Sequence, residues 1–291
     1  MRFSVIIPTY LDWDRLSNCL EALNKQQFPK EDFEVIVINN HLEHEEGKLL
    51  TGSNIKILHE PKPGSYAARN LGIQSAKGEI LAFTDSDCVP DTFWLSRADA
   101  FFKENPHLQR GAGKIELLYS NLDNNPVELY ESVYAFNQQE NAKKGLSVTA
   151  NFFAFRKLFT EIGYFDDSLF SGGDYQWNRL ATSSNMPMGY IADAKVFHPA
   201  RCSFEQLQKK AVRVAAGEFG ENLKKISKVS SCILLLKDCR PPLFEIKKIS
   251  KEKHLSFLQK TKVWCVRYWF RVTKAKEQFK LRTTNKSPEN I

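Results

Sequence analysis

Leu81-Ala82-Phe83-Thr84-Asp85-Ser86-Asp87-Cys88 is an apolar segment that stops at two aspartates separated by one serine. A buried strand with this ending delivers two carboxylates to the carboxyl edge of a sheet, where open α/β folds bind their ligands. Two carboxylates at such an edge suit Mg²⁺ or Mn²⁺ that holds a diphosphate. The alternative is an ordinary turn, because Asp and Ser are common turn residues.

The first hundred residues alternate between apolar strands and amphipathic helices. Strands are predicted over 3–7, 33–38, 54–59 and 79–84, and helices over 14–27 and 65–76. Continuous Val, Ile and Leu strands separated by helices predict a mostly parallel sheet with helices on both faces. The sequence contains neither a Gly-x-Gly-x-x-Gly motif nor a Walker loop, which argues against dinucleotide and P-loop chemistry.

The pattern continues to about residue 200 and then changes. Helices are predicted over 92–105 and 128–144, and strands over 111–118, 147–156 and 189–197. From residue 204 the chain is basic and helical, is interrupted by Pro241-Pro242, and ends in a segment, 283–291, that resembles disordered chain. We therefore expect an α/β domain over 1–203 and a basic helical C-terminal extension over 204–291.

The charge of the chain is unevenly distributed. The net charge is +7, but residues 200–291 carry +14 and the remainder carries −7. A basic tail suggests an anionic partner, such as lipid headgroups, nucleic acid or an acidic glycan. A solvated basic surface is the alternative.

The cysteines and the apolar segments bear on the cellular compartment. The six cysteines are scattered and form no Cys-x-x-Cys pair, which argues against a zinc site and for reduced thiols. No signal-like segment precedes the first strand, and no apolar run approaches the roughly 18 residues of a membrane-spanning helix. We therefore expect a cytoplasmic protein.

Five short motifs occur in a fixed order between residues 4 and 177. They are Ser4-Val5-Ile6-Ile7-Pro8-Thr9-Tyr10, Gly64-Ser65-Tyr66-Ala67-Ala68-Arg69-Asn70-Leu71-Gly72-Ile73, Phe83-Thr84-Asp85-Ser86-Asp87, Asn151-Phe152-Phe153-Ala154-Phe155-Arg156 and Gly172-Gly173-Asp174-Tyr175-Gln176-Trp177. In this order they resemble the family 2 glycosyltransferases with the GT-A fold, of the type that builds bacterial cell-surface polysaccharides. The resemblance covers roughly residues 3–200. It implies a nucleotide-sugar-binding half over 1–110 and an acceptor-binding half over 111–203.

The resemblance implies an inverting, metal-dependent transfer of a sugar from a nucleoside-diphosphate sugar, with UDP as the expected nucleotide. Asp87, with Asp85, would hold Mn²⁺ or Mg²⁺ at the diphosphate. Asp174 would take the proton of the acceptor hydroxyl, although it could instead cap the helix that begins at Tyr175. The donor would be surrounded by Pro8, Thr9, Tyr10, Asn40 and Arg69. For Arg69 a structural ion pair is an equal alternative.

The sequence departs from the family pattern at two places. The second strand ends in Asn39-Asn40 where the family usually has two aspartates, and Gly173 replaces the Glu of the Glu-Asp pair. An amide can still bond a pyrimidine base, because it carries both a donor and an acceptor. The second change leaves Asp174 as the single obvious base.

Further site residues are predicted near the end of the α/β domain. His198 follows the last strand and is a candidate metal ligand, with a polar strand end as the alternative. Arg201 could contact phosphate. Asn151 and Trp177 are candidates for the acceptor site, although a core position is the alternative for Trp177.

The segment 260–276 interleaves aromatic and aliphatic residues with basic ones. As a helix it would carry Val263, Trp264, Tyr268 and Phe270 beside Lys and Arg, which suits a membrane interface. The resemblance implies a saccharide or lipid-linked acceptor. We therefore predict peripheral attachment to the inner face of the plasma membrane through 204–291 and no nucleic-acid partner. The alternative is a helix packed on the catalytic domain with a basic outer face.

Two other classes of function compete with sugar transfer. A nucleotidyltransferase would need a Gly-rich basic loop after the first strand, where this chain has the acidic Thr9-Tyr10-Leu11-Asp12-Trp13-Asp14. A non-catalytic membrane or nucleic-acid binding protein would explain the basic tail. It would leave the Asp-Ser-Asp and Gly-Gly-Asp motifs without a role.

Overall fold

The computed structural model describes residues 1–41, 54–169, 171–222 and 227–283. The chain divides into two compact units, which we call the sheet unit and the C-terminal unit. The sheet unit comprises Met1–Glu116, Phe136–Ser168 and Gly173–Pro199, and the C-terminal unit comprises Leu117–Ala135, Leu169–Gly172 and Ala200–Ile291. The C-terminal unit thus starts within the predicted 1–203 domain, because residues 117–135 group with the later helices. Of the segment 283–291, which the sequence suggests is disordered, residues 284–291 lie outside the described residues.

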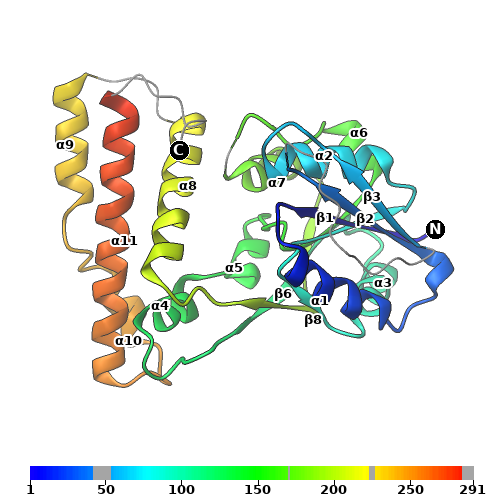
Figure 1. Cartoon of the computed structure of the whole chain (residues 1–291), viewed down its shortest axis with the longest axis horizontal. Helices are drawn as coiled ribbons and strands as arrows, with labels where there is room; N and C mark the ends of the chain where they lie inside the picture. Colours follow the sequence, from blue (N-terminus) through cyan, green and yellow to red (C-terminus); the bar gives the residue numbers. More distant parts are fainter. Residues whose placement is uncertain (42–53, 170, 223–226, 284–291) are drawn as a thin grey trace. The chain divides into compact units, whose positions relative to one another are not determined.

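One mixed sheet of eight strands forms the centre of the sheet unit (Figure 1). The strands are β1 (Phe3–Thr9), β2 (Phe33–Asn39), β3 (Ile55–His59), β4 (Ile80–Thr84), β5 (Val89–Pro90), β6 (Arg110–Leu118), β7 (Asn151–Phe155) and β8 (Met188–Pro199). Their order is β3-β2-β1-β4-β7-β6-β8-β5. The expected parallel arrangement holds for β3-β2-β1-β4, whereas β7 pairs antiparallel with β4 and β6, and β5 pairs antiparallel with β8.

Helices cover both faces of this sheet because alternate side chains of a strand point to opposite sides. On one face, Val5 and Ile7 of β1 join the apolar cluster of α1 (Trp13–Asn24) and α3 (Trp94–Glu104). On the other, Ile6 meets α2 (Ser65–Ser75) so closely that a Cβ on Gly72 would lie 2.7 Å from its Cγ2 atom. That face also carries α6 (Lys157–Glu161) and α7 (Gly173–Ser183) (Figure 1). A 3₁₀ turn, Lys30–Asp32, precedes β2.

The prediction of a single helix over 128–144 is wrong. Two helices form instead, α4 (Pro126–Tyr134) and α5 (Gln138–Lys143). The chain breaks at Phe136, whose φ of 45° lies in the left-handed region that ends a right-handed helix. Asn137 then starts α5 by accepting a hydrogen bond from the Glu140 backbone N–H.

The C-terminal unit consists of α4 together with four later helices, and it has no strand pattern in the described residues beyond the end of β6. These helices are α8 (Phe204–Asn222), α9 (Lys228–Asp238), α10 (Glu245–Ser250) and α11 (Phe257–Thr283). Pro241-Pro242 separates α9 from α10, as predicted. None of the described helices is both long and apolar enough to cross a bilayer.

The residues of α11 that were predicted to face a membrane pack inside the protein instead. Val263 and Phe270 are buried, because α11 packs them against α4 and α8. Trp264 and Tyr268 are partly buried and donate hydrogen bonds to the carbonyl oxygens of Pro242 and Cys239. This helix therefore contributes to the core of its own unit, and the four residues predicted to face a membrane are buried or partly buried there.

Candidate functional site

Asp85 and Asp87 directly follow β4, as the sequence predicts, and they have different partners. Asp85 Oδ1 accepts a 2.6 Å ion-paired hydrogen bond from Arg69 Nη2. Arg69 lies on α2, is buried, and has no hydrogen-bond partner for its Nε among the described residues. The structural ion pair considered for Arg69 therefore exists. It involves one of the two aspartates after β4, Asp85 and Asp87, which we call the aspartate cluster.

Asp87 lies between a histidine and an arginine. Its Oδ1 is 3.5 Å from His198 Nε2, and its Oδ2 is 3.6 Å from the exposed Arg15 Nη1. Burial raises the pKa of Asp87, and the negative charge of Asp85 adds to this, while His198 and Arg15 oppose it. A cation bound here would relieve that unfavourable burial of negative charge.

His198 is oriented in a way that suits a metal ligand. Its Nδ1 lies 2.7 Å from the carbonyl oxygen of Pro199, which can only accept, so Nδ1 carries the hydrogen. Whenever the ring is neutral, Nε2 therefore carries the lone pair, and this atom faces Asp87. The neighbouring Cys88 thiol is a poor ligand by comparison, because burial raises its pKa well above the usual value. Asp87 and His198, with Asp85 beside them, thus fit a divalent cation.

Asp174 lies in the first turn of α7 and accepts three hydrogen bonds. Oδ1 accepts from the Tyr175 backbone N–H at 2.9 Å and from the Tyr66 hydroxyl at 3.2 Å, and Oδ2 accepts from the Thr149 backbone N–H at 3.4 Å. The bond from Tyr175 is local, but a capping side chain accepts from the N–H two or three residues further on, and the other two donors come from distant segments. Loss of hydration raises the pKa of Asp174, although Arg69 and the three donors favour its ionised form.

Tyr66 is a site residue that the sequence reasoning did not assign. It lies one turn before Arg69 on α2, and the Arg69 guanidinium lies 5.8 Å from its ring centroid. A Cβ on Gly173 would stand 2.9 Å from Cε2 of this ring, so the glycine in place of the family's Glu gives Tyr66 its room. The spacing of Tyr66 and Arg69, three residues apart on a helix, was the available signal.

The residues predicted around the donor nucleotide lie at the ends of β1 and β2. Pro8 and Thr9 are buried, and the Thr9 hydroxyl has no hydrogen-bond partner among the described residues. Tyr10 is exposed, with its ring beside His41. Asn40 differs from the expectation of a base contact, because both of its amide hydrogens already bond the carbonyl oxygens of Glu60 and Lys62. Its oxygen accepts from the Gly64 N–H, so Asn40 holds the loop before α2.

The two residues predicted for the acceptor site are core residues instead. Asn151 is fully buried: its amide donates to the carbonyl oxygens of Lys114 and Ala194 and accepts from the Trp94 indole N–H. It therefore joins β7 to β6 and β8. Trp177 is also buried, stacks on Phe159 at 4.3 Å, and donates to the Gly163 carbonyl.

Arg201 differs from the phosphate contact predicted for it. Within the C-terminal unit, its Nη1 donates to the buried Glu131 at 2.8 Å, and Lys210 donates to the other oxygen of the same carboxylate at 2.9 Å. Burial opposes the ionisation of Glu131, but the two cations outweigh it and lower its pKa.

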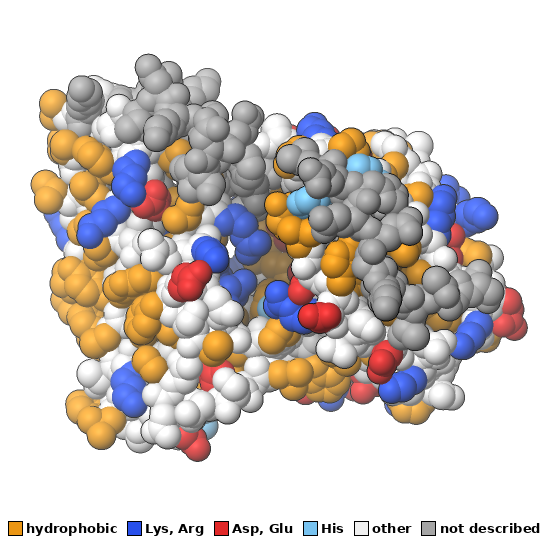
Figure 2. Space-filling model, viewed as in Figure 1, with side chains coloured by type: hydrophobic (Ala, Val, Ile, Leu, Met, Phe, Trp, Pro, Cys, Tyr) orange, Lys and Arg blue, Asp and Glu red, His pale blue; other side chains and the backbone are white. Residues whose placement is uncertain are grey.

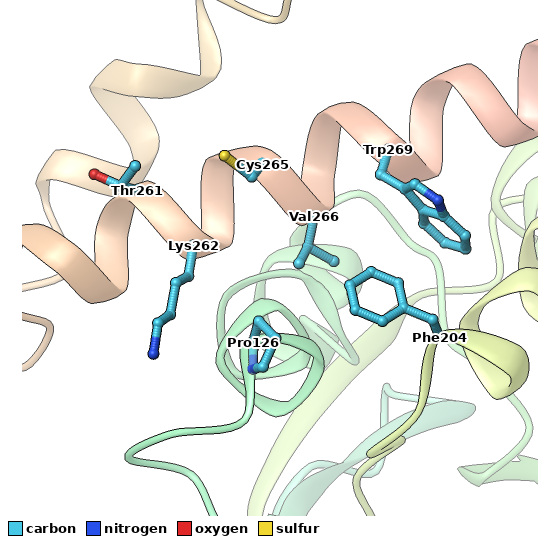
Figure 3. Close-up of a pocket in the computed structure, with 7 residues that line it drawn as sticks. All are labelled: Pro126, Phe204, Thr261, Lys262, Cys265, Val266 and Trp269. Atoms are coloured by element: carbon cyan, nitrogen blue, oxygen red, sulfur yellow. The ribbon is translucent and has the colours of Figure 1, made fainter.

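The C-terminal unit contains a groove of about 340 Å³ (Figure 3). It is lined by Pro126, Phe204, Thr261, Lys262, Cys265, Val266 and Trp269. Figure 3 shows the ring of Phe204 beside the indole of Trp269. The groove is mostly apolar and has no carboxylate in its lining, so it lacks the acidic groups of the candidate site.

Comparison with known proteins shows the family to which the chain belongs. The model of the family described as glycosyl transferase family 2 matches residues 4–163, which is more than half of the chain. The chain belongs to glycosyl transferase family 2. Membership of family 2 makes it a transferase enzyme rather than a non-catalytic binding protein.

Individual relatives extend the likeness. The chain is 34% identical over 222 residues to the glycosyltransferase AglE of Haloferax volcanii, covering 74% of this chain and 72% of that protein. Two further relatives are much longer: the poly(ribitol-phosphate) beta-glucosyltransferase of Bacillus spizizenii and TarS of Staphylococcus aureus are matched over 18–19% of their own length. A Staphylococcus aureus TarS structure with UDP-GlcNAc is 19% identical with a TM-score of 0.54, over 97% of this chain and 90% of that one. A mannosyltransferase of Pyrobaculum calidifontis, solved with GDP-Man and Mn²⁺, is 16% identical with a TM-score of 0.57, over 95% and 84%. At these identities the two structures confirm the GT-A fold.

Proposed function

We propose that this family 2 enzyme transfers a sugar, with inversion, from a nucleoside-diphosphate sugar to a hydroxyl group of a saccharide or lipid-linked acceptor. The observation that supports this most is the link through Arg69. Its guanidinium pairs with Asp85 at 2.6 Å and also favours the ionised form of Asp174. The buried guanidinium of Arg69 therefore interacts both with Asp85, on the proposed diphosphate side, and with Asp174, the proposed base.

On the donor side, Asp87 and His198 Nε2 would hold Mn²⁺ or Mg²⁺, with Asp85 beside them. A bound divalent cation supplies Lewis-acid stabilisation to the departing nucleoside diphosphate. Thr9, whose hydroxyl has no hydrogen-bond partner among the described residues, is proposed to line the nucleotide site together with Pro8 and Tyr10. UDP is the proposed nucleotide, in line with the UDP-GlcNAc bound to TarS, while the mannosyltransferase complex holds GDP-Man.

On the acceptor side, Asp174 is proposed as the general base. As the acceptor oxygen bonds to the anomeric carbon, its proton moves to an Asp174 oxygen, and the bond from that carbon to the diphosphate breaks on the opposite face. The raised pKa makes Asp174 a stronger base than an ordinary aspartate. Tyr66 and Arg69 hold the carboxylate in place during this transfer. A lipid-linked acceptor would be met at the cytoplasmic face of a membrane.

A donor screen tests this function. Hydrolysis of UDP-, GDP- and dTDP-sugars is measured with Mn²⁺, with Mg²⁺ and with a chelator. We expect hydrolysis of at least one donor, stimulated by metal, and at least about a hundredfold loss in Asp174→Asn. Asp14→Asn, which changes an exposed aspartate on α1, serves as the matched control and keeps full activity. Equal rates in Asp174→Asn and in the control would reject Asp174 as the base.

A further inference from the structure

Helix α9 of the C-terminal unit directs apolar side chains outward. Val229, Ile233 and Leu236 are spaced by four and three residues, so they lie on one face of the helix. All three are more than 60% exposed. Ser231, on the other side, is fully buried where α9 packs against α11. A helix that already has its packing partner and still exposes an apolar face marks an interaction surface.

The apolar surface continues past the end of α9. Leu243, Phe244 and Ile246 are between 51% and 70% exposed. The Arg271 guanidinium lies 5.5 Å from the Phe244 ring and donates to the carbonyl of Asp238, the last residue of α9, which places Phe244 beside that helix end. Figure 2 shows hydrophobic side chains along this edge of the unit. We call the surface the apolar edge; it consists of Val229, Ile233, Leu236, Leu243, Phe244 and Ile246.

The charges along the apolar edge are mainly basic. Six cationic residues in the stretch 237–253, which runs from the end of α9 to just before α11, are exposed: Lys237, Arg240, Lys247, Lys248, Lys251 and Lys253. The same stretch has three acidic residues, and one of them, Glu245, is buried and held by Arg267 at 2.7 Å. The accessible charge beside the apolar side chains is therefore positive.

We propose that the apolar edge inserts into the headgroup region of an anionic lipid bilayer. Exposed apolar side chains flanked by lysines are the combination that holds a protein on such a surface without spanning it. The flanking charge favours lipid over a second copy of this chain, because two copies meeting at this edge would bring lysine against lysine. The inference extends the proposed lipid-linked acceptor but uses none of the residues assigned to catalysis.

Vesicle sedimentation tests the apolar edge directly. The full chain is mixed with phosphatidylcholine vesicles, with and without phosphatidylglycerol, at low and high salt. Ile233→Ser/Leu236→Ser/Phe244→Ser removes apolar contact, and we expect about tenfold weaker binding for each side chain lost. Lys247→Gln/Lys251→Gln removes charge, and we expect about 25-fold weaker binding to the anionic vesicles at low salt. Phe93→Ser, which changes an exposed aromatic of the sheet unit, is the matched control.

The outcomes separate the surface from the catalytic assignment. Binding that needs phosphatidylglycerol, weakens with salt and is lost in the triple variant supports the proposal, provided that this variant keeps its far-UV circular dichroism and its donor hydrolysis. Equal binding by wild type and triple variant, or no binding by wild type, overturns it. A wild-type dimer that the triple variant converts to monomer also overturns it, in favour of an interface between copies. Vesicle binding without any donor hydrolysis would instead reject the proposed function alone.

Discussion

Removal of the Tyr66 hydroxyl tests whether the pKa of Asp174 governs the reaction. In Tyr66→Phe the carboxylate loses a donor that favours its ionised form, so the pKa of Asp174 rises further above its ordinary value. A hydrogen bond to a charged group contributes about 1.5–3 kcal/mol, and the length of 3.2 Å argues for the lower end. About 1.4 kcal/mol corresponds to one pH unit.

The assay is the pH dependence of kcat/KM for sugar transfer or donor hydrolysis at saturating metal, which reports the pKa of the free enzyme. Because the base must be deprotonated, activity falls as the pH decreases through its pKa. We expect the acidic limb of Tyr66→Phe to move up by about one pH unit, with about tenfold lower activity below the limb and wild-type activity above it.

Tyr175→Phe is the matched control for this experiment. It removes a hydroxyl next to Asp174 in the chain, but this hydroxyl accepts from Asn141 and does not bond the carboxylate. We expect an unchanged pH profile. A Tyr66→Phe profile that coincides with wild type, or that moves to lower pH, would refute the assignment of Asp174 as a base tuned by Tyr66.

Three further substitutions test the packing of the sheet unit and, separately, of the C-terminal unit. Gly173→Ala places a Cβ 2.9 Å from the Tyr66 ring, so the ring must move, and the pH profile should shift in the same direction as in Tyr66→Phe. Asn151→Ala removes three buried hydrogen bonds, so urea unfolding should show a loss of about 3 kcal/mol with unchanged UDP affinity of the folded protein. Weaker acceptor binding without loss of stability would contradict the core role. Glu131→Gln removes the partner of two cations and should cost about 3 kcal/mol in the same assay, whereas Glu205→Gln, at an exposed pair, should leave stability unchanged. Because the pKa of Glu131 is lowered, its stabilisation should be lost as the pH falls below the usual range of glutamate titration.

The parallel half of the sheet could be predicted from sequence because its signals are local. Each strand is a continuous apolar run, and each helix has an apolar stripe and an end signal. The antiparallel pairing of β7 with β4 and β6 is a contact between distant segments, and no local pattern encodes it. The break at Phe136 was missed because neither Gly nor Pro marks it.

The places of the candidate carboxylates in the fold could be predicted, but their surroundings could not. Asp85, Asp87 and Asp174 stand at motif positions that the sequence preserves. Asn151 was misassigned because a polar residue at the start of a strand has the same appearance whether it contacts a ligand or joins three strands in the core. Tyr66 was missed because its role depends on Gly173, more than a hundred residues away, which leaves space for its ring.

The membrane-facing segment was misplaced for a related reason. Apolar residues at helical spacing on α11 indicate an amphipathic helix, but periodicity does not tell whether the apolar face meets lipid or the rest of the protein. Val263 and Phe270 meet the protein. The exposed apolar residues lie on α9, where the sequence alone gives a short apolar run, Cys232-Ile233-Leu234-Leu235-Leu236, with no indication of which side is covered.

Calorimetric titration of UDP, with Mn²⁺ and with a chelator, tests most directly whether the aspartate cluster holds a diphosphate through a cation. In the wild type, Mn²⁺ should strengthen UDP binding by at least about tenfold, which corresponds to 1.4 kcal/mol. Asp87→Asn and His198→Ala should lose this gain, while Asp14→Asn should keep it. UDP affinity that is the same with Mn²⁺ and with chelator in the wild type would contradict the account.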